Sequence, residues 1–315
     1  MGGVSSVSIY PEFVKQAIAI NPKYCSMITP SRCMNATSGA LVSYRDSMLI
    51  DDRISMLYDF VNANNCFPTV EIKGGISYFL WDSSYSGNCM ITLTDSQGRK
   101  TTGFRPLLEE GMETFIRNEK MISLLYKVKS LNENSFSEIV SANDPFGYDT
   151  REEHSSKRVK VSYSLKKGEG QIPLYYNGWR NEGVGYVNKT SVKRNQSAID
   201  KHKVFIPKAW GIGDPSKDWI NPFIPDKYAV CTETYLMVGP FSSEEEAINC
   251  SKYMQTKFFH LMVAFIKSTQ NTMQKAYAVV PLQDFSIEWT DEKLYNKYGF
   301  NEEEIALIES TIKPT

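Results

Sequence analysis

The chain has 315 residues, of which 42% are hydrophobic and 23% are charged, and its formal net charge is −1. These values are typical of a soluble globular protein of about two domains, and they exclude the global charge excess that marks many nucleic-acid- and membrane-binding proteins. The six cysteines include no C-x-x-C pair and the three histidines no H-x-x-x-H pair. We therefore expect no metal site and no Cys/His nucleophile, but free thiols in a reducing cytoplasm. Neither a signal peptide nor a membrane span is predicted.

Helix and strand patterns alternate in the first third of the chain. Helical spacing of apolar residues and short apolar runs predict, in chain order, a helix over 8–20, a strand over 24–29, a helix over 39–50 and strands over 53–60, 75–82 and 89–95. Alternation of this kind predicts a doubly wound parallel α/β sheet, of which only part is present. The last strands follow without a helix between them, which predicts an antiparallel strand at the edge of the sheet.

The composition changes after a connecting helix, which is predicted over 113–129. Residues 132–240 are rich in Gly, Asn, Ser and Tyr and contain short strand-like pieces at 158–165 and 185–188. Helices are predicted over 243–267, where Ser243 and Glu246 form a capping box, and over 291–298 and 302–312. We therefore divide the chain into an α/β domain (1–110), a connecting helix (111–131) and an α+β domain (132–315).

Charge is unevenly distributed over the second domain. Residues 151–217 hold 14 Lys and Arg against 6 Asp and Glu, whereas residues 284–315 hold 3 against 8. Aromatic residues are interleaved with the Lys and Arg residues of this basic segment. Lys203 is one of these cations. Such a segment is suited to phosphate neutralisation and base contacts, or it is a solvated basic face over an aromatic core.

Two other patterns suggest enzyme chemistry. Glu71-Ile72-Lys73, with Asp59 upstream, fits the E-x-K of a metal-dependent nuclease, although this short pattern also arises by chance. The glycine pairs at 168–170, 183–185 and 211–213 neither follow a long apolar strand nor open a helix, so they are predicted to be turns and not phosphate loops.

Several stretches together resemble the adenine-N6 DNA methyltransferases of restriction–modification systems. They cover nearly the whole chain in order: IYPEFVKQAIAINPKYCSMITPSR (9–32), SYRDSMLIDDRISMLYDFVNANNCFPTVEIKGGISYFLWD (43–82), KVFIPKAWGIGD (203–214), TETYLMVGPFSSEEEA (232–247) and AYAVVPLQDFSIEWTDEKLYNKYGFNEEEIALIE (276–309). The resemblance implies the later half of a Rossmann-like methyltransferase domain followed by a target-recognition domain that binds double-stranded DNA.

The chain departs from that family in its catalytic motifs. It lacks a Gly-rich S-adenosylmethionine loop after a first strand, and none of its 14 prolines adjoins another, so the Asn-Pro-Pro-Tyr tetrapeptide is absent. The resemblance therefore implies S-adenosylmethionine for the complete enzyme, but no catalytic residue and no cofactor in this chain alone. A separately encoded N-terminal half is an expected partner, because a missing strand beside 24–29 would leave an open sheet edge.

Candidate DNA-binding residues follow from the basic segment and from the resemblance. They are Trp179, Arg180, Lys189, Lys193, Arg194, Lys208 and Trp210, with Gln270, Asn271 and Lys275 as a second group that could instead be a polar helix end. In the family, an aromatic residue of a Phe-Pro loop stacks on the flipped adenine, which carries over to Phe67; the alternative is a loop aromatic that fills the core. Gly74 and Gly75 are expected to form a turn or a close-packed site. Two alternatives stay open for the whole chain: a stand-alone DNA-binding specificity protein and a restriction endonuclease.

Overall fold

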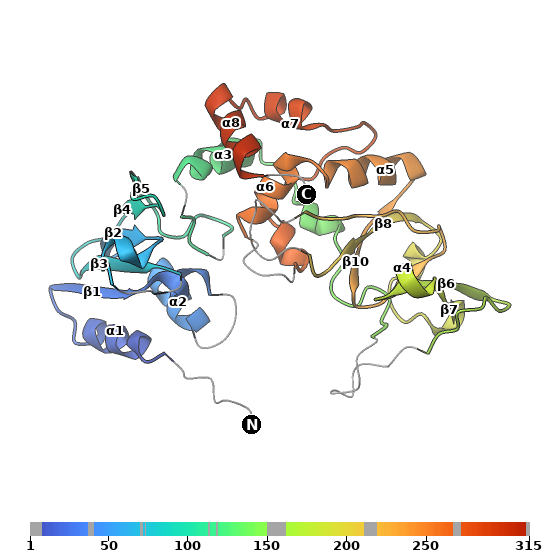
Figure 1. Ribbon diagram of the computed structural model, residues 1–315, viewed down its shortest axis with the longest axis horizontal. Coiled ribbons are helices and arrows are strands. Elements are labelled where there is room, and N and C mark those ends of the chain that lie inside the picture. Colours follow the sequence, from blue (N-terminus) through green and yellow to red (C-terminus); the bar gives the residue numbers. More distant parts are fainter. Residues whose placement is uncertain are drawn as a thin grey trace. The chain divides into compact units, whose positions relative to one another are not determined.

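The computed structural model describes residues 8–36, 41–69, 72, 74–112, 114–117, 119–149, 162–210, 219–266 and 272–312. The chain divides into two compact units, unit 1 (Met1–Ser123) and unit 2 (Leu124–Thr315). The division falls within the connecting helix, which is shorter than predicted and is α3 (Glu119–Lys129). Figure 1 shows the elements of both units in chain order. All six cysteines are free, and within the described residues no helix is both long and apolar enough to cross a bilayer.

Unit 1 has the predicted α/β class and is built on a mixed sheet, which has five strands and not the four that were predicted. Its strands are β1 (Tyr24–Pro30), β2 (Ile54–Phe60), β3 (Ile76–Asp82), β4 (Cys89–Thr94) and β5 (Lys100–Arg105), in the spatial order β1-β3-β2-β4-β5. β2 and β4 are parallel, whereas the other neighbouring strands are antiparallel.

The position of the antiparallel strand differs from the prediction. The strand that the sequence identifies at 75–82 is β3, and it lies between β1 and β2 and not at the edge. The antiparallel strand at the edge is β5, which the sequence pattern did not reveal. A connection without a helix indicates that the next strand runs antiparallel. It does not indicate whether that strand pairs at the edge of the sheet or between two strands that are already present.

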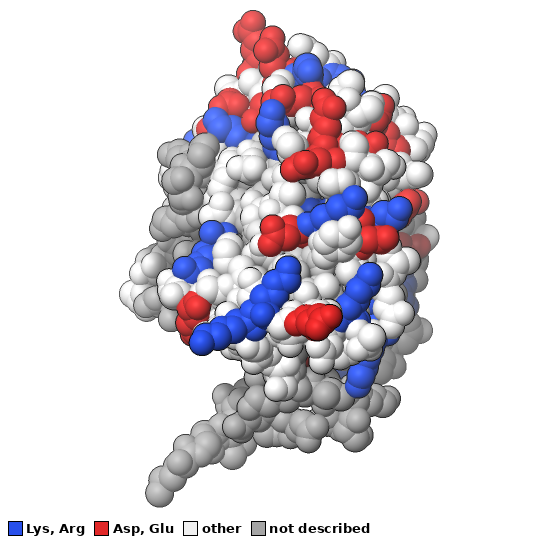
Figure 2. Space-filling view, turned by 90° about the vertical axis from the view of Figure 1, so that its right-hand side faces the viewer, with Lys and Arg blue, Asp and Glu red and all other residues white. Residues whose placement is uncertain are grey.

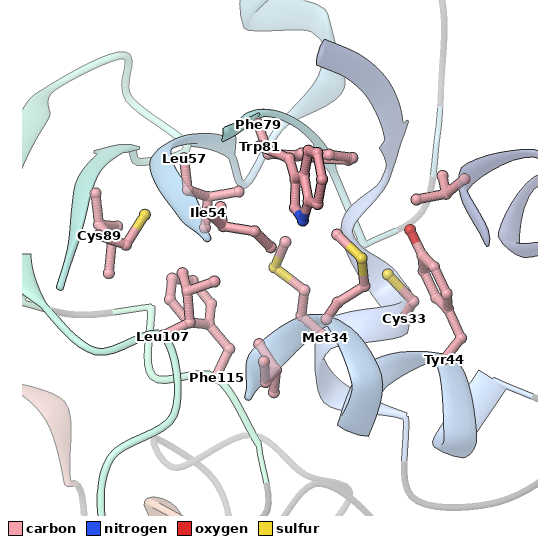
Figure 3. Packing of buried hydrophobic residues seen from close by; sticks show 14 of the residues in the cluster. Cys33, Met34, Tyr44, Ile54, Leu57, Phe79, Trp81, Cys89, Leu107 and Phe115 are labelled. Carbon is pink, nitrogen blue, oxygen red and sulfur yellow. The ribbon is translucent and has the colours of Figure 1, made fainter. Parts of the chain in front are cut away.

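One face of the sheet carries the core of unit 1. Helices α1 (Tyr10–Ala19) and α2 (Leu41–Leu49) pack against alternate strand residues, and Figure 3 shows Leu57, Phe79 and Trp81 of the strands gathered with Met34 and Tyr44. Trp81 Nε1 also donates to Asp51 Oδ2 at 3.1 Å. On α2, Tyr44, Arg45, Met48 and Leu49 are buried, and Leu41 is partly buried. The helix predicted over 39–50 is thereby confirmed.

The opposite face of the sheet is apolar but open. The strand register places Ile28, Tyr78 and Tyr58 in one row, and Leu80, Met56, Met90 and Phe104 in the next. Ile28 is 54% exposed and Phe104 65% exposed, and the rings of Tyr58 and Tyr78 stack at 4.7 Å. On α1, Val14 is buried, but Phe13 and the preceding N-cap residue Ile9 are exposed. Unit 1 thus presents more apolar surface than a doubly wound sheet normally leaves uncovered.

Unit 2 is an α+β unit with two small sheets. One sheet has the order β7-β6-β9 and the other pairs β8 with β10; the strands are β6 (Gln171–Tyr175), β7 (Gly185–Asn188), β8 (His202–Pro207), β9 (Val230–Cys231) and β10 (Tyr235–Phe241). Strand β7 was predicted; of the piece predicted at 158–165, residues 158–161 lie outside the described residues, and 162–165 contribute only the isolated bridge from Ser164 to Tyr186.

The helices of unit 2 pack against these sheets and one another. They are the short α4 (Trp179–Glu182), then α5 (Glu244–Tyr253), α6 (Lys257–Ala264), α7 (Asp291–Lys297) and α8 (Glu302–Thr311). The single helix predicted over 243–267 is wrong. Ser243 caps α5 by accepting from the Glu246 amide, but the chain then turns, and Thr256 caps α6 by accepting from the Phe259 amide. Threonine competes for backbone hydrogen bonds and so favours a new helix start over a helix interior.

Candidate functional site

The loop between β2 and β3, residues 61–75, carries Phe67 at one end of the unit 1 sheet. Asn62 caps a short 3-10 turn, η2 (Ala63–Asn65), by accepting from the Asn64 amide, and the Phe67 amide donates to the Ala63 carbonyl at 2.8 Å. Ala63 is buried, whereas Phe67 is 38% exposed. Part of Phe67 is therefore accessible to a ligand.

Two consecutive glycines end the same loop. At each of them a side chain would clash with neighbouring atoms. Gly75 has φ +81°, and a Cβ there would lie 2.1 Å from the Phe60 carbonyl oxygen. Gly74 has φ +91°, and a Cβ there would lie 2.9 Å from Arg32 Cβ. The expected turn and close-packing site is present, and it feeds directly into β3.

Asp59, at the end of β2, is paired with an arginine. Arg117 Nε lies 2.8 Å from Asp59 Oδ2, and the carboxylate is fully buried. Burial raises the pKa of Asp59 although Arg117 acts in the opposite direction. Glu71 and Lys73 of the E-x-K pattern lie outside the described residues. Within the part of the chain that the structure describes, no group of three or more His, Cys, Asp and Glu side chains could hold a metal ion.

In unit 2, Trp179 and Arg180 belong to an aromatic cluster beside the β6 sheet. Trp179 is half-buried, and its Nε1 donates to the Tyr235 hydroxyl at 2.9 Å. The exposed Arg180 guanidinium lies 4.8 Å from the Trp179 ring and 5.6 Å from the Phe223 ring. These contacts restrict the side-chain rotamers of Arg180 before any ligand binds. Phe223 comes from a distant segment, and no sequence spacing pointed to it.

Lys189, Lys193 and Arg194 lie together on the exposed turns that follow β7. The Lys193 amide donates to the Phe146 carbonyl, and Asn195 Nδ2 donates to the Pro145 carbonyl at 2.7 Å. These bonds hold the cationic segment against the 143–149 loop. All three cationic side chains are solvent-exposed.

Lys208 contacts the segment that holds the second group of candidate DNA-binding residues. Its Nζ donates to Asn143 Oδ1 at 3.2 Å, and its carbonyl accepts from the Thr272 amide at 2.8 Å. This bond brings the 272–275 segment, with exposed Lys275, beside the basic segment. Gln270 and Asn271 lie outside the described residues.

Two residues of the basic segment belong to the interior. Trp210 is buried, with its ring edge-on to His260 at 5.6 Å between centroids. Lys203 is buried as well, and its Nζ donates to the carbonyls of Ile199, Lys201 and Lys227. Burial lowers the pKa of Lys203 to about 8. Lys203 is therefore a structural cation and not part of a solvated basic face. A count of charges in the sequence does not distinguish these two roles.

The surface of this region combines the exposed cations with neutral residues. Figure 2 shows Lys and Arg over much of one face, with Asp and Glu among them and most numerous toward its upper end. The acidic first turns of α5 and α8, with three glutamates each, account for part of the opposite charge. A basic region of this kind suits a polyanion.

Comparison with known proteins connects the N-terminal stretch to methylases. Residues 3–67 match the family model described as Eco57I restriction-modification methylase. An uncharacterized adenine-specific methylase of Mycoplasma pneumoniae (strain ATCC 29342 / M129 / Subtype 1) is 35% identical over 100 residues. That alignment covers 32% of this chain, and the chain spans 24% of that relative. The resemblance to adenine-specific restriction–modification methylases is thereby confirmed over part of the chain.

Two solved structures show weak likeness over most of the chain. The type IIG restriction endonuclease BpuSI aligns with 92% of this chain and 47% of its own, at 10% identity and a TM-score of 0.35. The type IIL restriction-modification enzyme MmeI, solved in complex with DNA, aligns with 98% of this chain and 45% of its own, at 10% identity and a TM-score of 0.40. TM-scores this low do not establish a common fold.

Proposed function

We propose that the chain is part of a site-specific DNA adenine-N6 methyltransferase of a restriction–modification system. In this proposal unit 2 recognises the DNA target, and unit 1 supplies one wall of the pocket that receives the flipped adenine. The match of residues 3–67 to the methylase family carries the proposal. That stretch ends at Phe67, the exposed aromatic residue to which we assign stacking on the extruded base.

DNA recognition is assigned to the cations that unit 2 exposes. Lys189, Lys193 and Arg194 are placed to neutralise phosphates, and the pre-ordered guanidinium of Arg180 is suited to a base edge. Lys208 and Lys275 extend the same surface. Trp210 is buried against His260, so we assign it a structural role and no direct contact with DNA.

Methyl transfer needs groups that this chain does not contain. Adenine's exocyclic amine is a poor nucleophile, and S-adenosylmethionine supplies the methyl group when it is bound to the complete enzyme. Among the described glycines of unit 1 with positive φ, Gly87 and Gly98 lie in turns between strands, and Gly111 lies between β5 and α3 but not at the start of that helix. These residues do not fit a nucleotide-binding loop, so we assign no cofactor and no methyl transfer to this chain alone.

A second polypeptide that carries the cofactor-binding half is the partner we propose. Among the described strands, β1 pairs only with β3, so its other edge is free. Ile28 on β1 is exposed, as are Ile9 and Phe13 on or beside α1, and α1 contacts β1. A parallel strand and its helices would cover these groups, as both faces of such sheets are normally covered.

Binding to labelled duplex DNA tests the recognition role. The pair Lys189→Gln and Lys193→Gln should weaken binding and reduce the slope of log K against log salt by about 2, since each lost phosphate contact removes roughly 0.9. The matched pair Lys252→Gln and Lys293→Gln removes the same charge from unit 2, but Lys252 pairs with Glu288 on the acidic side, so the slope should stay unchanged. Equal effects of both pairs, or no binding by the unaltered chain, would contradict the proposal.

A further inference from the structure

One arginine side chain ties the start of the 61–75 loop to its end. Arg117 Nη2 donates to Asp59 Oδ1 at 3.0 Å, where β2 ends, and to the Gly74 carbonyl oxygen at 2.8 Å, just before β3 begins. Nε of the same guanidinium faces Asp59 Oδ2 at 2.8 Å. A planar guanidinium holds several acceptors in fixed directions, which a lysine ammonium does not reproduce.

The surroundings leave this connection little freedom. Asp59 is fully buried, and the Arg117 side chain is 19% exposed, so the charges cannot separate without leaving a carboxylate alone in the interior. Beside them, the Ser31 amide donates to the Gly75 carbonyl at 3.0 Å, and the Gly75 amide donates to the Ile72 carbonyl at 3.1 Å. The end of the loop is therefore fixed against β1, β2 and Arg117 together.

The start of the loop is fixed as well. The Val61 amide donates to the Thr94 carbonyl at 3.0 Å, and Asn65 Nδ2 donates to the Asp95 carbonyl at 2.9 Å. Between these anchors lies Phe67, a large apolar residue that is partly exposed. Its position depends on how rigidly both ends are held.

We propose that Arg117 and Asp59 are positioning residues for Phe67, which they set in the place where it stacks on the extruded base. The inference rests on the proposed function for the role of Phe67, but not for the coupling between the ion pair and the loop. It also gives Asp59 a role other than metal binding, since its carboxylate already faces a cation. Neither residue needs to touch the DNA.

The test uses the full chain with 4-fluorophenylalanine at position 67 alone. In Arg117→Lys we expect hydrogen exchange in a peptide covering 61–69 to accelerate roughly tenfold, the factor that corresponds to one lost hydrogen bond. The fluorine resonance should move toward its position in the urea-unfolded chain. Arg53→Lys is the matched control, because Arg53 pairs with Asp51 at 2.8 Å at the start of β2, and it should change neither signal.

Asp59→Asn gives a second variant that keeps the side-chain shape and should alter the same two signals. Unchanged exchange and an unchanged fluorine resonance in Arg117→Lys would overturn the inference. So would equal acceleration in the peptides of β2 and β3, which would mean general destabilisation. These outcomes are independent of DNA binding: a chain that binds no DNA but shows the loop effect refutes the proposed function and leaves the positioning role standing.

Discussion

Gly75 occupies a position that no residue with a side chain can take without strain. Its φ of +81° is in the left-handed region, and its Cα packs against the Phe60 carbonyl at the point where the loop enters β3. Gly98 has the same φ of +81°, but nothing lies within 4 Å of where its Cβ would be. The two glycines share one backbone conformation, and only Gly75 adds a steric barrier.

Alanine substitutions at these two glycines separate the cost of the positive φ from the cost of the steric clash. Gly98→Ala should lower the free energy of unfolding by about 1 kcal/mol, the usual cost of a positive φ in an L-residue. Gly75→Ala should lower it by about 3 kcal/mol or more, because the new methyl group also meets backbone that cannot move aside. Urea unfolding of both variants measures the difference. Similar values for the two variants would contradict the close packing at Gly75.

Phe67 and Trp210 show how burial changes the interpretation of an aromatic residue. The sequence offers the same two choices for each, core or ligand contact. Phe67 follows the local turn at Ala63–Asn65 and is partly exposed, whereas Trp210 packs against His260. The burial of Trp210 could not be predicted from its flanking residues, because His260 is distant in the chain.

At the element scale, the open face of the unit 1 sheet stands out. Met90 and Phe104 face each other across β4 and β5 and are both exposed. Next to them are the half-buried Met56 and Leu80, and the free edge of β1 lies beyond. A contiguous apolar surface and a free strand edge both favour association with other chains.

A lysine on this face should raise the solubility of the chain when it is expressed alone. We expect Phe104→Lys to increase the soluble concentration several-fold, since it interrupts the apolar surface without leaving a core cavity. Thr101→Lys is the control, because Thr101 is exposed on the other face of the same strand. Light scattering of the purified chains measures the effect. Equal gains from both lysines would show that added charge alone is responsible.

The elements of unit 1 were predicted well because each carries a local signal, either helical spacing of apolar residues or a short apolar run. The boundaries of α1, α2 and β1 to β4 agree with the prediction within a few residues. The insertion of β3 between β1 and β2 and the existence of β5 were not predictable in this way. Strand order depends on pairings between distant segments, and the polar sequence of β5, KTTGFR, lacks an apolar alternation.

At the scale of the whole molecule, the cations of the candidate site can be identified from the sequence, but the residues that they contact cannot. The basic segment was visible as a charge excess, yet Lys203 is an interior cation bound by three carbonyls. The acceptor Asn143 and the ring of Phe223 were missed, since they approach Lys208 and Arg180 only through folding. The ion pair of Arg117 with Asp59 was missed for the same reason.

The central claim is that this chain recognises a particular DNA sequence for an adenine methyltransferase. Selection of bound duplexes from a randomised DNA library, followed by sequencing, tests it most directly. We predict that the retained pool converges on one short motif that contains an adenine. The Lys189→Gln, Lys193→Gln pair should retain less DNA but select the same motif, because phosphate contacts carry no sequence information. A pool that stays random after repeated rounds, or no retention of DNA by the unaltered chain, would contradict the claim.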